Sequence, residues 1–302
     1  MAKHTVRIAT RKSALALAQA RAFVREVGAS NPDVVFEEVL ITTTGDRVQD
    51  RLLSEIGGKG LFVKEIEEAL LDGRADFAVH SLKDVPPELP PGLVMGCFPK
   101  REDARDVLIS RSGQGLSALP SGSRVGTSSL RRRVQLEAVR PDLRVEVLRG
   151  NVDTRLRKCE SGEVDAILLA RAGLVRLGLA DRVTEVLEPE VLLPAVGQGA
   201  LGIEHRAGDD RIAAILAPLA HRETKIAVAA ERGVMRAVEG SCQMPVAGYA
   251  IKDGSAMYLR GLLAEPDGSN LRRNEIRVPW PDVEITAEAA GLELGRRLRH
   301  GN

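Results

Sequence analysis

Three consecutive arginines follow a threonine and two serines in the stretch GTSSLRRR, which covers residues 126–133. The stretch reads as the end of a strand followed by the start of a helix, where free backbone N–H groups and hydroxyls form an anion site. Cationic side chains oppose the dipole at a helix N-terminus, so their presence favours a bound anion. Successive helical side chains point about 100° apart, so one of the three arginines should face only solvent. The alternative is a basic surface helix. The stretch comprises Thr127, Ser128, Ser129, Arg131, Arg132 and Arg133.

Further arginines stand where the sequence predicts strand ends. Arg149 precedes the flexible Gly150 in LRGNVDTR, Arg155 lies one turn into the next predicted helix, and Arg11 follows the strand VRIAT. Ligands of open α/β sheets collect at the carboxyl ends of the strands. The guanidinium group binds carboxylates in a bidentate fork, so the predicted ligand is a polycarboxylate. We expect one cleft between two domains to receive Arg11, Arg131, Arg132, Arg149 and Arg155.

A carboxylate stands beside a lysine in HSLKDVPP, just past another predicted strand end. Ser81, Lys83 and Asp84 are the polar residues of this stretch. An acid next to a lysine is often only a surface ion pair. In a cationic cleft, however, Asp84 would be suited to stabilising a developing cation and to transferring a proton. We therefore predict that Asp84 is the catalytic carboxylate.

The three cysteines lack metal-ligand spacing and cannot all pair with one another. Cys97 and Cys159 fall on apolar patterns that predict core positions. Cys242 lies in EGSCQMP, a predicted loop between a helix and a strand, where a nucleophilic thiol is more accessible. A structural or incidental cysteine is the alternative for this position. The five histidines show no metal spacing either, so no metal site is predicted.

Composition argues against several classes of protein. The 302 residues carry 43 basic and 42 acidic side chains, which is too balanced for a protein that coats nucleic acid. One Trp, two Tyr and five Phe leave few rings for stacking on bases. Neither a signal peptide nor a membrane span is predicted, so a reducing cytoplasm fits best. A GxGxxG match at 197–202 precedes IEHRAGDD, a poor first turn for a dinucleotide-binding helix.

The order of predicted elements indicates three domains. Strands and helices alternate over the first 200 residues, which predicts parallel sheets. IATRKSALALAQ resembles VGTSSLRRRVQ, and GLFVKEIEEALLDGRADFAV resembles GNVDTRLRKCESGEVDAIL, so two α/β domains of similar build are expected. In the first of them, Ser13 should cap a helix, and Phe62, Ile66 and Leu70 should share a helical face. The domains are predicted at 1–99 with 200–217, at 104–193, and at 220–302, the last being α+β with an antiparallel sheet.

These stretches together resemble the porphobilinogen deaminase (hydroxymethylbilane synthase) family. The match runs from RIATRKSALALAQA through GGKGLFVKEIE, AVHSLKDVP, VGTSSLRRR, LRGNVDTRL and LPAVGQGALGIE to EGSCQMP, in order and over nearly the whole chain. The departures are Ser241 and Met244, where the family usually has Gly and Val, and a C-terminus that is short by part of a helix. None of these departures removes a reacting group.

The resemblance implies a fold, a reaction and a set of roles. The fold is two α/β domains like type II periplasmic binding proteins, plus the smaller C-terminal domain. The reaction joins four porphobilinogen molecules into a linear tetrapyrrole, each with loss of ammonia, on a dipyrromethane primer that Cys242 holds through a thioether. Each pyrrole carries an acetate and a propionate, which accounts for the clustered arginines. A monomer is expected, because an enclosed cleft requires no partner.

Individual positions follow from the same resemblance. Catalytic roles fall to Asp84, Lys83, Arg11 and Lys59, the last at the end of a glycine-rich lid. The cofactor is expected to contact Cys242, Ser81, Lys83, Asp84, Thr127, Ser128, Ser129, Arg131, Arg132 and Gly150. The substrate is expected to contact Arg11, Ser13, Phe62, Arg149, Arg155, Arg176 and Gln198.

Two other classes remain as alternatives. A two-lobed ligand-binding protein would use the same arginines but would need export or a partner, and it leaves Cys242 without a role. A nucleic-acid-binding protein would direct the arginines at phosphates. Intact mass separates the enzyme from both, because only the enzyme should carry the extra mass of two linked pyrroles.

Overall fold

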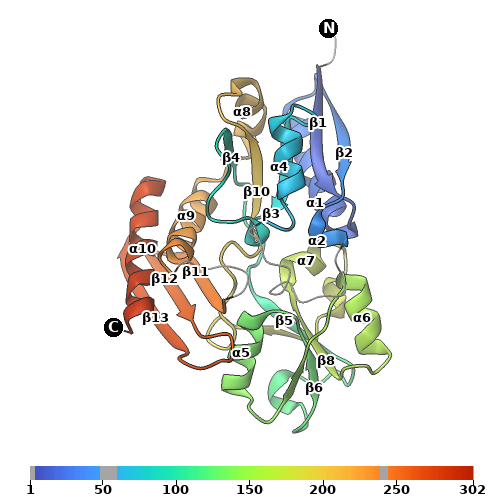
Figure 1. The fold of residues 1–302 in the computed structure, drawn as a ribbon, viewed down its shortest axis with the longest axis vertical. Coiled ribbons are helices and arrows are strands. Elements are labelled where there is room, and N and C mark those ends of the chain that lie inside the picture. The colour runs from blue at the N-terminus through green and yellow to red at the C-terminus, as the bar shows by residue number, and fades with distance from the viewer. Residues whose placement is uncertain (1–3, 48–59, 239–243, 302) are drawn as a thin grey trace. The chain divides into compact units, whose positions relative to one another are not determined.

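The computed structural model describes residues 4–47, 60–238 and 244–301 (Figure 1). The chain divides into two compact units, residues 1–102 with 200–225 and residues 103–199 with 226–302. The predicted domain limits remain predictions.

The first unit is built on a mixed five-stranded sheet in the order β2-β1-β3-β10-β4. β1 pairs in parallel with β2 and β3, whereas β10 runs antiparallel to β3 and β4. The elements are β1 (His4–Arg11), α1 (Ala14–Ser30), β2 (Val34–Ile41), α2 (Thr44–Arg47), α4 (Lys64–Leu71), β3 (Phe77–Ser81), the 3-10 turn η1 (Leu82–Asp84), β4 (Leu93–Cys97), β10 (Leu201–Arg206), α8 (Asp210–Leu216) and the 3-10 turn η4 (Ala217–Leu219).

Helix α1 shows why this sheet folds as it does. It begins after Ser13, whose hydroxyl accepts a hydrogen bond from the Ala16 amide at 3.3 Å, as the sequence predicted. Ala20, Phe23 and Val27 recur at helical spacing and are buried against the sheet. Phe23 meets the Phe77 ring of β3 edge to face, with the centroids 5.9 Å apart. The helix thereby fixes the end of β1, where Arg11 lies.

The second unit contains another mixed five-stranded sheet, in the order β7-β6-β8-β5-β9. β6 pairs in parallel with β7 and β8, and β5 runs antiparallel to β8 and β9. The elements are β5 (Asp106–Ser110), the 3-10 turn η2 (Leu116–Ala118), β6 (Arg124–Gly126), α5 (Leu130–Val139), β7 (Arg144–Glu146), α6 (Val152–Glu160), β8 (Ala166–Ala170), α7 (Arg171–Arg176), the 3-10 turn η3 (Ala180–Arg182) and β9 (Glu185–Leu187).

The two sheets have equivalent strand orders, and an equivalent aspartate–arginine contact occurs in each. Asp76 precedes β3 and accepts a hydrogen bond from the Arg7 backbone amide at 2.8 Å. Asp165 precedes β8 and accepts one from the Arg124 backbone amide, also at 2.8 Å. The Nε of the same arginine also donates to each aspartate, at 3.3 Å from Arg7 to Asp76 and at 3.4 Å from Arg124 to Asp165. The internal repeat predicted from the sequence is therefore confirmed, and by this equivalence Thr10 and Thr127 hold matching positions at the strand ends.

The C-terminal part of the second unit is a three-stranded antiparallel meander covered by helices. It consists of α9 (Arg222–Ala237), β11 (Val246–Asp253), β12 (Ala256–Leu263), β13 (Arg272–Pro279) and α10 (Glu284–His300). Gly254 turns the β11–β12 hairpin with a positive φ of 61°. A Cβ at Gly291 would lie 1.9 Å from the Ala230 carbonyl oxygen, so only glycine lets α10 approach α9 this closely.

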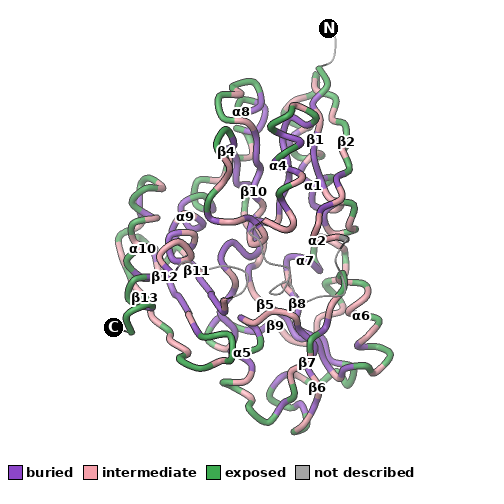
Figure 2. The backbone as a smooth tube through the Cα atoms, viewed as in Figure 1, coloured by how far each residue is buried: buried purple, intermediate pink, exposed green. Residues whose placement is uncertain are grey.

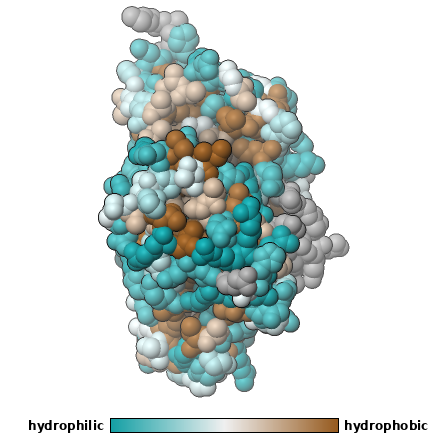
Figure 3. Space-filling model, turned by 90° about the vertical axis from the view of Figure 1, so that its left-hand side faces the viewer, coloured by the Kyte–Doolittle hydropathy of each residue, from teal (hydrophilic) through white to brown (hydrophobic). Residues whose placement is uncertain are grey.

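Burial follows the sheets (Figure 2), with buried backbone along the central strands and exposed residues on the outer helices and turns. Hydrophilic residues predominate on the face shown in Figure 3, and hydrophobic ones form separate smaller patches. Within the described ranges, no helix is both long and apolar enough to cross a membrane. The α/β class with a smaller antiparallel part is confirmed.

Two expectations about the fold are wrong. Parallel sheets were expected, but both sheets are mixed, because β10 and β5 enter their sheets from the opposite end and run antiparallel to their neighbours. Phe62 was expected on the face of a helix with Ile66 and Leu70, but α4 begins only at Lys64 and Phe62 lies in the turn before it. The GxGxxG glycines lead into strand β10 rather than into a helix, so they do not form a dinucleotide fingerprint.

Candidate functional site

The first unit gathers five of the predicted residues around one pocket. Its lining includes Arg11, Ser13, Phe62, Ser81 and Asp84. Arg11 ends β1, Ser81 ends β3, and Asp84 closes the 3-10 turn that follows. Adjacent parallel strands thus bring their carboxyl ends to one place, as expected for a ligand site in an α/β sheet.

Arg11 is held in this pocket by a carboxylate and an aromatic ring. Its Nε lies 3.2 Å from both carboxylate oxygens of Asp46, and its Nη2 also pairs with Asp46. The guanidinium carbon lies 4.3 Å from the centre of the Phe62 ring, a cation–π distance. Burial alone would raise the pKa of Asp46, but Arg11 holds it below its usual range. The protein itself therefore supplies Arg11 with a carboxylate partner.

Ser81 is fixed by a buried side chain that the sequence did not single out. The Nε2 of Gln19 donates to the Ser81 hydroxyl at 2.8 Å, and Gln19 is buried in α1. Lys83 and Asp84 follow in the 3-10 turn, and both are half-buried. The Leu82 amide donates to the Ala200 carbonyl at 3.1 Å, which ties this turn to the start of β10. Asp84 is thus a partly accessible carboxylate on a well-anchored turn.

Buried titratable groups lie on β3, β10 and α4 of the same unit. The Nε2 of His80, on β3, lies 2.9 Å from a carboxylate oxygen of Glu204 on β10, and both side chains are buried. Glu67 of α4 is also buried, and burial together with the negative charge of Glu204 raises its pKa to about 7. Burial and Glu204 therefore favour the neutral form of the Glu67 carboxyl at pH values where an ordinary glutamate is ionised.

In the second unit, Ser129 caps α5 and directs its N-terminus. The Ser129 hydroxyl accepts from the Arg132 amide at 3.4 Å, and the Thr127 hydroxyl accepts from the Ser129 amide at 3.2 Å. Thr127 itself is buried at the end of β6. The predicted strand-to-helix junction is therefore present, with hydroxyls beside the first helical amides.

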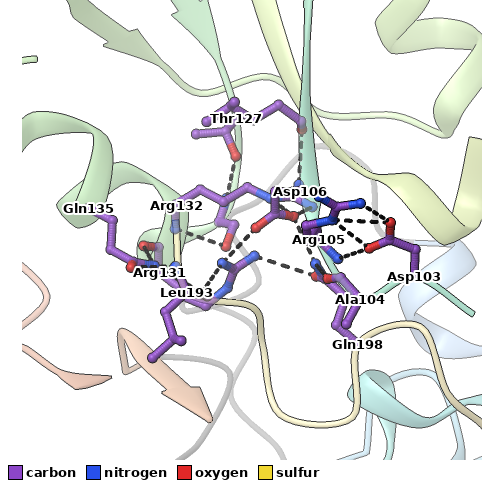
Figure 4. Close-up of polar contacts among 12 residues, drawn as sticks. Asp103, Ala104, Arg105, Asp106, Thr127, Arg131, Arg132, Gln135, Leu193 and Gln198 are labelled. Carbon is purple, nitrogen blue, oxygen red and sulfur yellow. Dashed lines mark hydrogen bonds and ion pairs between the residues drawn. The ribbon is translucent and has the colours of Figure 1, made fainter. Parts of the chain in front are cut away.

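Arg131 and Arg132 converge on one buried carboxylate, Asp106 of β5 (Figure 4). Arg131 Nη1 lies 2.8 Å from Asp106 Oδ2, and Arg132 Nη2 donates to Oδ1 at 2.7 Å. Arg131 and Arg132 are 5% exposed and Asp106 is fully buried. Burial would raise the pKa of Asp106, but the two arginines lower it to about 2. Two cations therefore share one protein carboxylate in the interior.

The segment leading to β10 contributes Gln198 to the same cluster. Its Nε2 donates to Asp106 Oδ1 at 2.9 Å and to the Ala104 carbonyl at 2.6 Å. Its Oε1 lies 3.5 Å from Arg131 Nη2. Arg176, at the end of α7, donates from Nη2 to the Gly199 carbonyl at 2.7 Å. Gln198 is thus part of the arginine cluster, and Arg176 binds the backbone next to it.

A second group of cations surrounds Arg155 on α6. Its Nε donates to the Gly150 carbonyl at 2.8 Å, and its Nη2 lies 3.4 Å from the Ser128 hydroxyl. Burial, with the charges of Arg132 and Arg149, lowers the pKa of Arg155 to about 10. Gly150 adopts φ 116°, and a Cβ there would lie 2.8 Å from that of Thr154, so glycine is required. Crowded positive charge of this kind is relieved by a bound anion.

The remaining predicted positions are an exposed arginine, two buried cysteines and two residues that the structure does not describe. Arg133 is half-exposed and pairs with Glu137 one turn along α5, so it is the arginine that faces solvent, as expected. Cys97 and Cys159 are buried, and burial raises the pKa of each thiol, that of Cys97 to about 12. Lys59 and Cys242 lie outside the described residues. Whether the arginines of the two units face one cleft stays a prediction.

The sequence reasoning missed four buried polar residues that organise these sites. They are Gln19, His80, Asp106 and Glu204. One signal was available for Asp106, because an aspartate directly before the apolar run VLI resembles Asp76 and Asp165, which also precede strands. The others stand within apolar or helical patterns, where a polar residue gives no sign of its partner. Among the described residues, no group of His, Cys, Asp and Glu could hold a metal ion.

The solved structures that the fold resembles include binding components of ABC transporters. The substrate binding domain of a putative molybdenum ABC transporter from Clostridium difficile matches with a TM-score of 0.45 and 10% identity, over 74% of this chain and 95% of that chain. A probable amino-acid ABC transporter extracellular-binding protein from Bacillus subtilis matches with a TM-score of 0.43 and 9% identity, over 72% and 90%. With TM-scores below 0.5, these likenesses carry no argument about binding or activity.

Sequence comparison gives a much closer match. Residues 6–214 match the family model described as "Porphobilinogen deaminase, dipyromethane cofactor binding domain", and residues 225–300 match "Porphobilinogen deaminase, C-terminal domain". A protein named porphobilinogen deaminase from Sorangium cellulosum is 61% identical over 294 residues, which are 97% of this chain and 98% of that protein. The chain therefore belongs to the porphobilinogen deaminase family.

Proposed function

We propose that this chain joins four porphobilinogen molecules head to tail, with loss of ammonia, into the linear tetrapyrrole hydroxymethylbilane. Membership of the porphobilinogen deaminase family makes it a transferase of tetrapyrrole and heme biosynthesis with a dipyrromethane cofactor. The observation that best supports this chemistry is the arginine group at the N-termini of α5 and α6. Arg131 and Arg132 have Asp106 as a buried carboxylate partner, and burial together with the charges of Arg132 and Arg149 lowers the pKa of Arg155.

The residues present fit a ligand that carries several carboxylates. Arginine donors, a capped helix N-terminus and hydroxyl groups bind carboxylates well. We propose that Arg131, Arg132, Thr127, Ser128, Ser129 and Gly150 hold the cofactor. When bound, the cofactor supplies the α-carbon on which the pyrrole chain grows. Its covalent attachment to Cys242 rests on the match of EGSCQMP to the family motif.

The pocket of the first unit is proposed to receive the reacting pyrrole. Loss of ammonia leaves positive charge on the pyrrole nitrogen, and Asp84 would stabilise that charge and accept a proton. Arg11, stacked on Phe62, would bind a substrate carboxylate in exchange for Asp46. Ser81, oriented by Gln19, would donate a hydrogen bond from the strand end.

The other roles are proposals of the same kind. Substrate carboxylates would be bound by Arg149, Arg155, Arg176 and Gln198, with Ser13 at the start of α1. Lys83 would act beside Asp84 in both cofactor binding and catalysis, and Lys59 would act from the segment before Phe62. We propose that the enzyme works as a monomer in the cytoplasm.

Intact mass and one substitution test the proposal. The purified protein should exceed its sequence mass by two linked pyrroles and should give a positive Ehrlich aldehyde reaction after denaturation and washing. Cys242→Ser should lose the extra mass, the colour and the activity. Cys97→Ala and Cys159→Ala are matched controls, because both thiols are buried with raised pKa values. Colour that persists in washed Cys242→Ser protein would place the attachment elsewhere.

A further inference from the structure

Asp106 was not predicted as a site residue, yet it is fully buried and contacts three residues that were. It opens β5 with no exposed surface, and three predicted site residues reach its two oxygens (Figure 4). Arg132 donates from Nε at 3.1 Å and from Nη2 at 2.7 Å, and Gln198 donates at 2.9 Å, all to Oδ1. Arg131 Nη1 lies 2.8 Å from Oδ2. One carboxylate therefore holds Arg132 and Gln198 through hydrogen bonds to Oδ1 and Arg131 through an ion pair at Oδ2, which accepts no hydrogen bond from the residues that the structure describes.

Backbone carbonyl groups also accept hydrogen bonds from both arginines, and some N–H donors of each guanidinium group are still not used by these contacts. Arg132 Nη1 donates to the Leu168 carbonyl at 2.9 Å, and Arg131 Nη1 donates to the Leu193 carbonyl at 2.6 Å. An arginine has five N–H donors in a rigid plane, so fixing part of the plane fixes the direction of the rest. Both guanidinium groups are thereby aimed before any ligand arrives.

The charges explain why a ligand is still attracted. Arg131, Arg132 and Asp106 together carry net positive charge in a buried place, where an unbalanced cation is unfavourable. Arg155, whose pKa is lowered by burial and by Arg132, adds to the excess. The negative charge of Asp106 thus neutralises one of the two arginine charges, which allows both side chains to be buried. The remaining positive charge can attract the carboxylates of a ligand.

We propose that Asp106 is a positioning residue, an internal carboxylate that aims Arg131, Arg132 and Gln198 at the carboxylates of the cofactor and the growing chain. This inference rests on the proposed function. Asp106 acts through the arginines and touches no reacting atom. Its removal should therefore weaken cofactor capture and substrate binding, and an added carboxylate should stabilise the cofactor-free variant more than the cofactor-free parent.

The test compares Asp106→Asn and Asp106→Glu with the parent. Asn keeps the size of the side chain but removes its charge and directs an NH₂ donor at the arginines. Glu keeps the charge and shifts it by one methylene. Intact mass gives the fraction of each protein that carries the cofactor, and steady-state kinetics on the loaded fraction give KM and kcat. We expect a reduced loaded fraction in both variants, with KM raised ~10-fold or more and kcat changed less.

A second measurement separates positioning from simple structural support. Thermal unfolding of cofactor-free protein is followed in chloride and in succinate at equal ionic strength. Succinate should raise the melting temperature of Asp106→Asn more than that of the parent, because its arginines lack an internal counter-ion. Asp165→Asn is the matched control, since Asp165 holds Arg124 in the same unit with its side chain 31% exposed. It should melt lower than the parent but load fully and show no added response to succinate.

The outcomes are distinct. Folded Asp106→Asn with the parental loaded fraction, KM and succinate response would overturn the inference. If Asp106→Asn does not fold, Asp106→Glu decides in the same way: reduced loading with raised KM supports positioning, and parental values overturn it. A parent protein without the extra mass would overturn the proposed function, and this inference with it.

Discussion

Asp84 is the side chain on which we expect the proposed reaction to depend most. It ends an anchored 3-10 turn and lines a pocket with Arg11. Asn keeps its size and an acceptor oxygen but loses the charge, so we expect Asp84→Asn to be nearly inactive. Asp84→Glu keeps the charge but moves it by about one methylene, where an error near 1 Å can reduce the rate ~100-fold. We expect that variant to be slow but active.

Single-addition assays on cofactor-loaded protein measure this without interference from failed cofactor assembly. Both variants should remain folded, since Asp84 is not a core residue. If loaded Asp84→Asn adds porphobilinogen at nearly the parental rate, neither the charge of Asp84 nor its proton transfer drives the reaction.

We expect Glu67 to make the stability of the first unit depend on pH. Burial and the charge of Glu204 raise its pKa to about 7 from an ordinary 4.5, partly offset by His80, with exposed Glu68 adding a smaller effect. The folded state therefore binds this proton more tightly than the unfolded state. The contribution of Glu67 to stability is full below about pH 4.5 and is lost as the pH rises through about 7.

Replacing Glu67 with Gln removes this dependence. The stability of Glu67→Gln relative to the parent should rise between about pH 5 and pH 8, by up to about 3 kcal/mol. Urea unfolding of the first unit at several pH values measures the difference. Glu68→Gln, the neighbouring exposed position on α4, is the control and should show no such trend. A constant difference between Glu67→Gln and the parent across this range would contradict the assignment.

Helix α5 places adjacent arginines in different surroundings. Arg132 points inward to Asp106, whereas Arg133 is half-exposed and pairs with Glu137 at helical spacing. Such exposed pairs contribute about 0.2–0.5 kcal/mol, so Arg133→Ala should load cofactor and turn over within roughly twofold of the parent. Arg132→Ala should fail to load. Intact mass and turnover compare the two, and an inactive but folded Arg133→Ala would refute this geometry.

Much of the element order could be predicted because local signals agree with the fold. Ser13 caps its helix as predicted, Ser129 caps α5, the Asp253-Gly254 turn forms, and Ile226, Ala230 and Val234 share a buried face. Strand direction could not be predicted. Side chains alternate from face to face in either direction, so the pattern in β10 is the same whether the strand runs parallel or antiparallel.

The candidate sites show the same limit. The sequence could mark cations at strand ends and helix starts, because turns and hydroxyls surround them. It could not show that Asp46 would pair with Arg11 or that Asp106 would pair with Arg131 and Arg132. These pairs join residues far apart along the chain, and spacing within a motif carries no information about them. Lys59 and Cys242 remain predictions.

The second unit as a whole should depend on its cofactor for stability. Residues 103–199 and 226–302 belong to one compact unit, and fully buried Glu231 of α9 accepts from the Gly197 amide at 2.8 Å and the Ala250 amide at 2.9 Å. The arginine cluster and the C-terminal sheet are thus tied together. A cofactor held by both would bind only the folded state and stabilise it by linkage.

Cofactor-free protein should therefore melt lower than loaded protein and be cut faster by trypsin. A shift of roughly 5–10 °C is expected, since each kcal/mol moves the midpoint of a domain this size by about 2–4 °C.

Added salt should raise the melting temperature of the cofactor-free form more than that of the loaded form, because salt screens the repulsion among Arg132, Arg149 and Arg155 that carboxylates otherwise relieve. Cys242→Ser, which cannot load, should behave as cofactor-free protein in every buffer. Calorimetry and timed proteolysis of the three proteins measure this. Equal midpoints and equal salt responses for the loaded and cofactor-free forms would mean that the excess positive charge is balanced within the protein, and that the cofactor serves the chemistry alone.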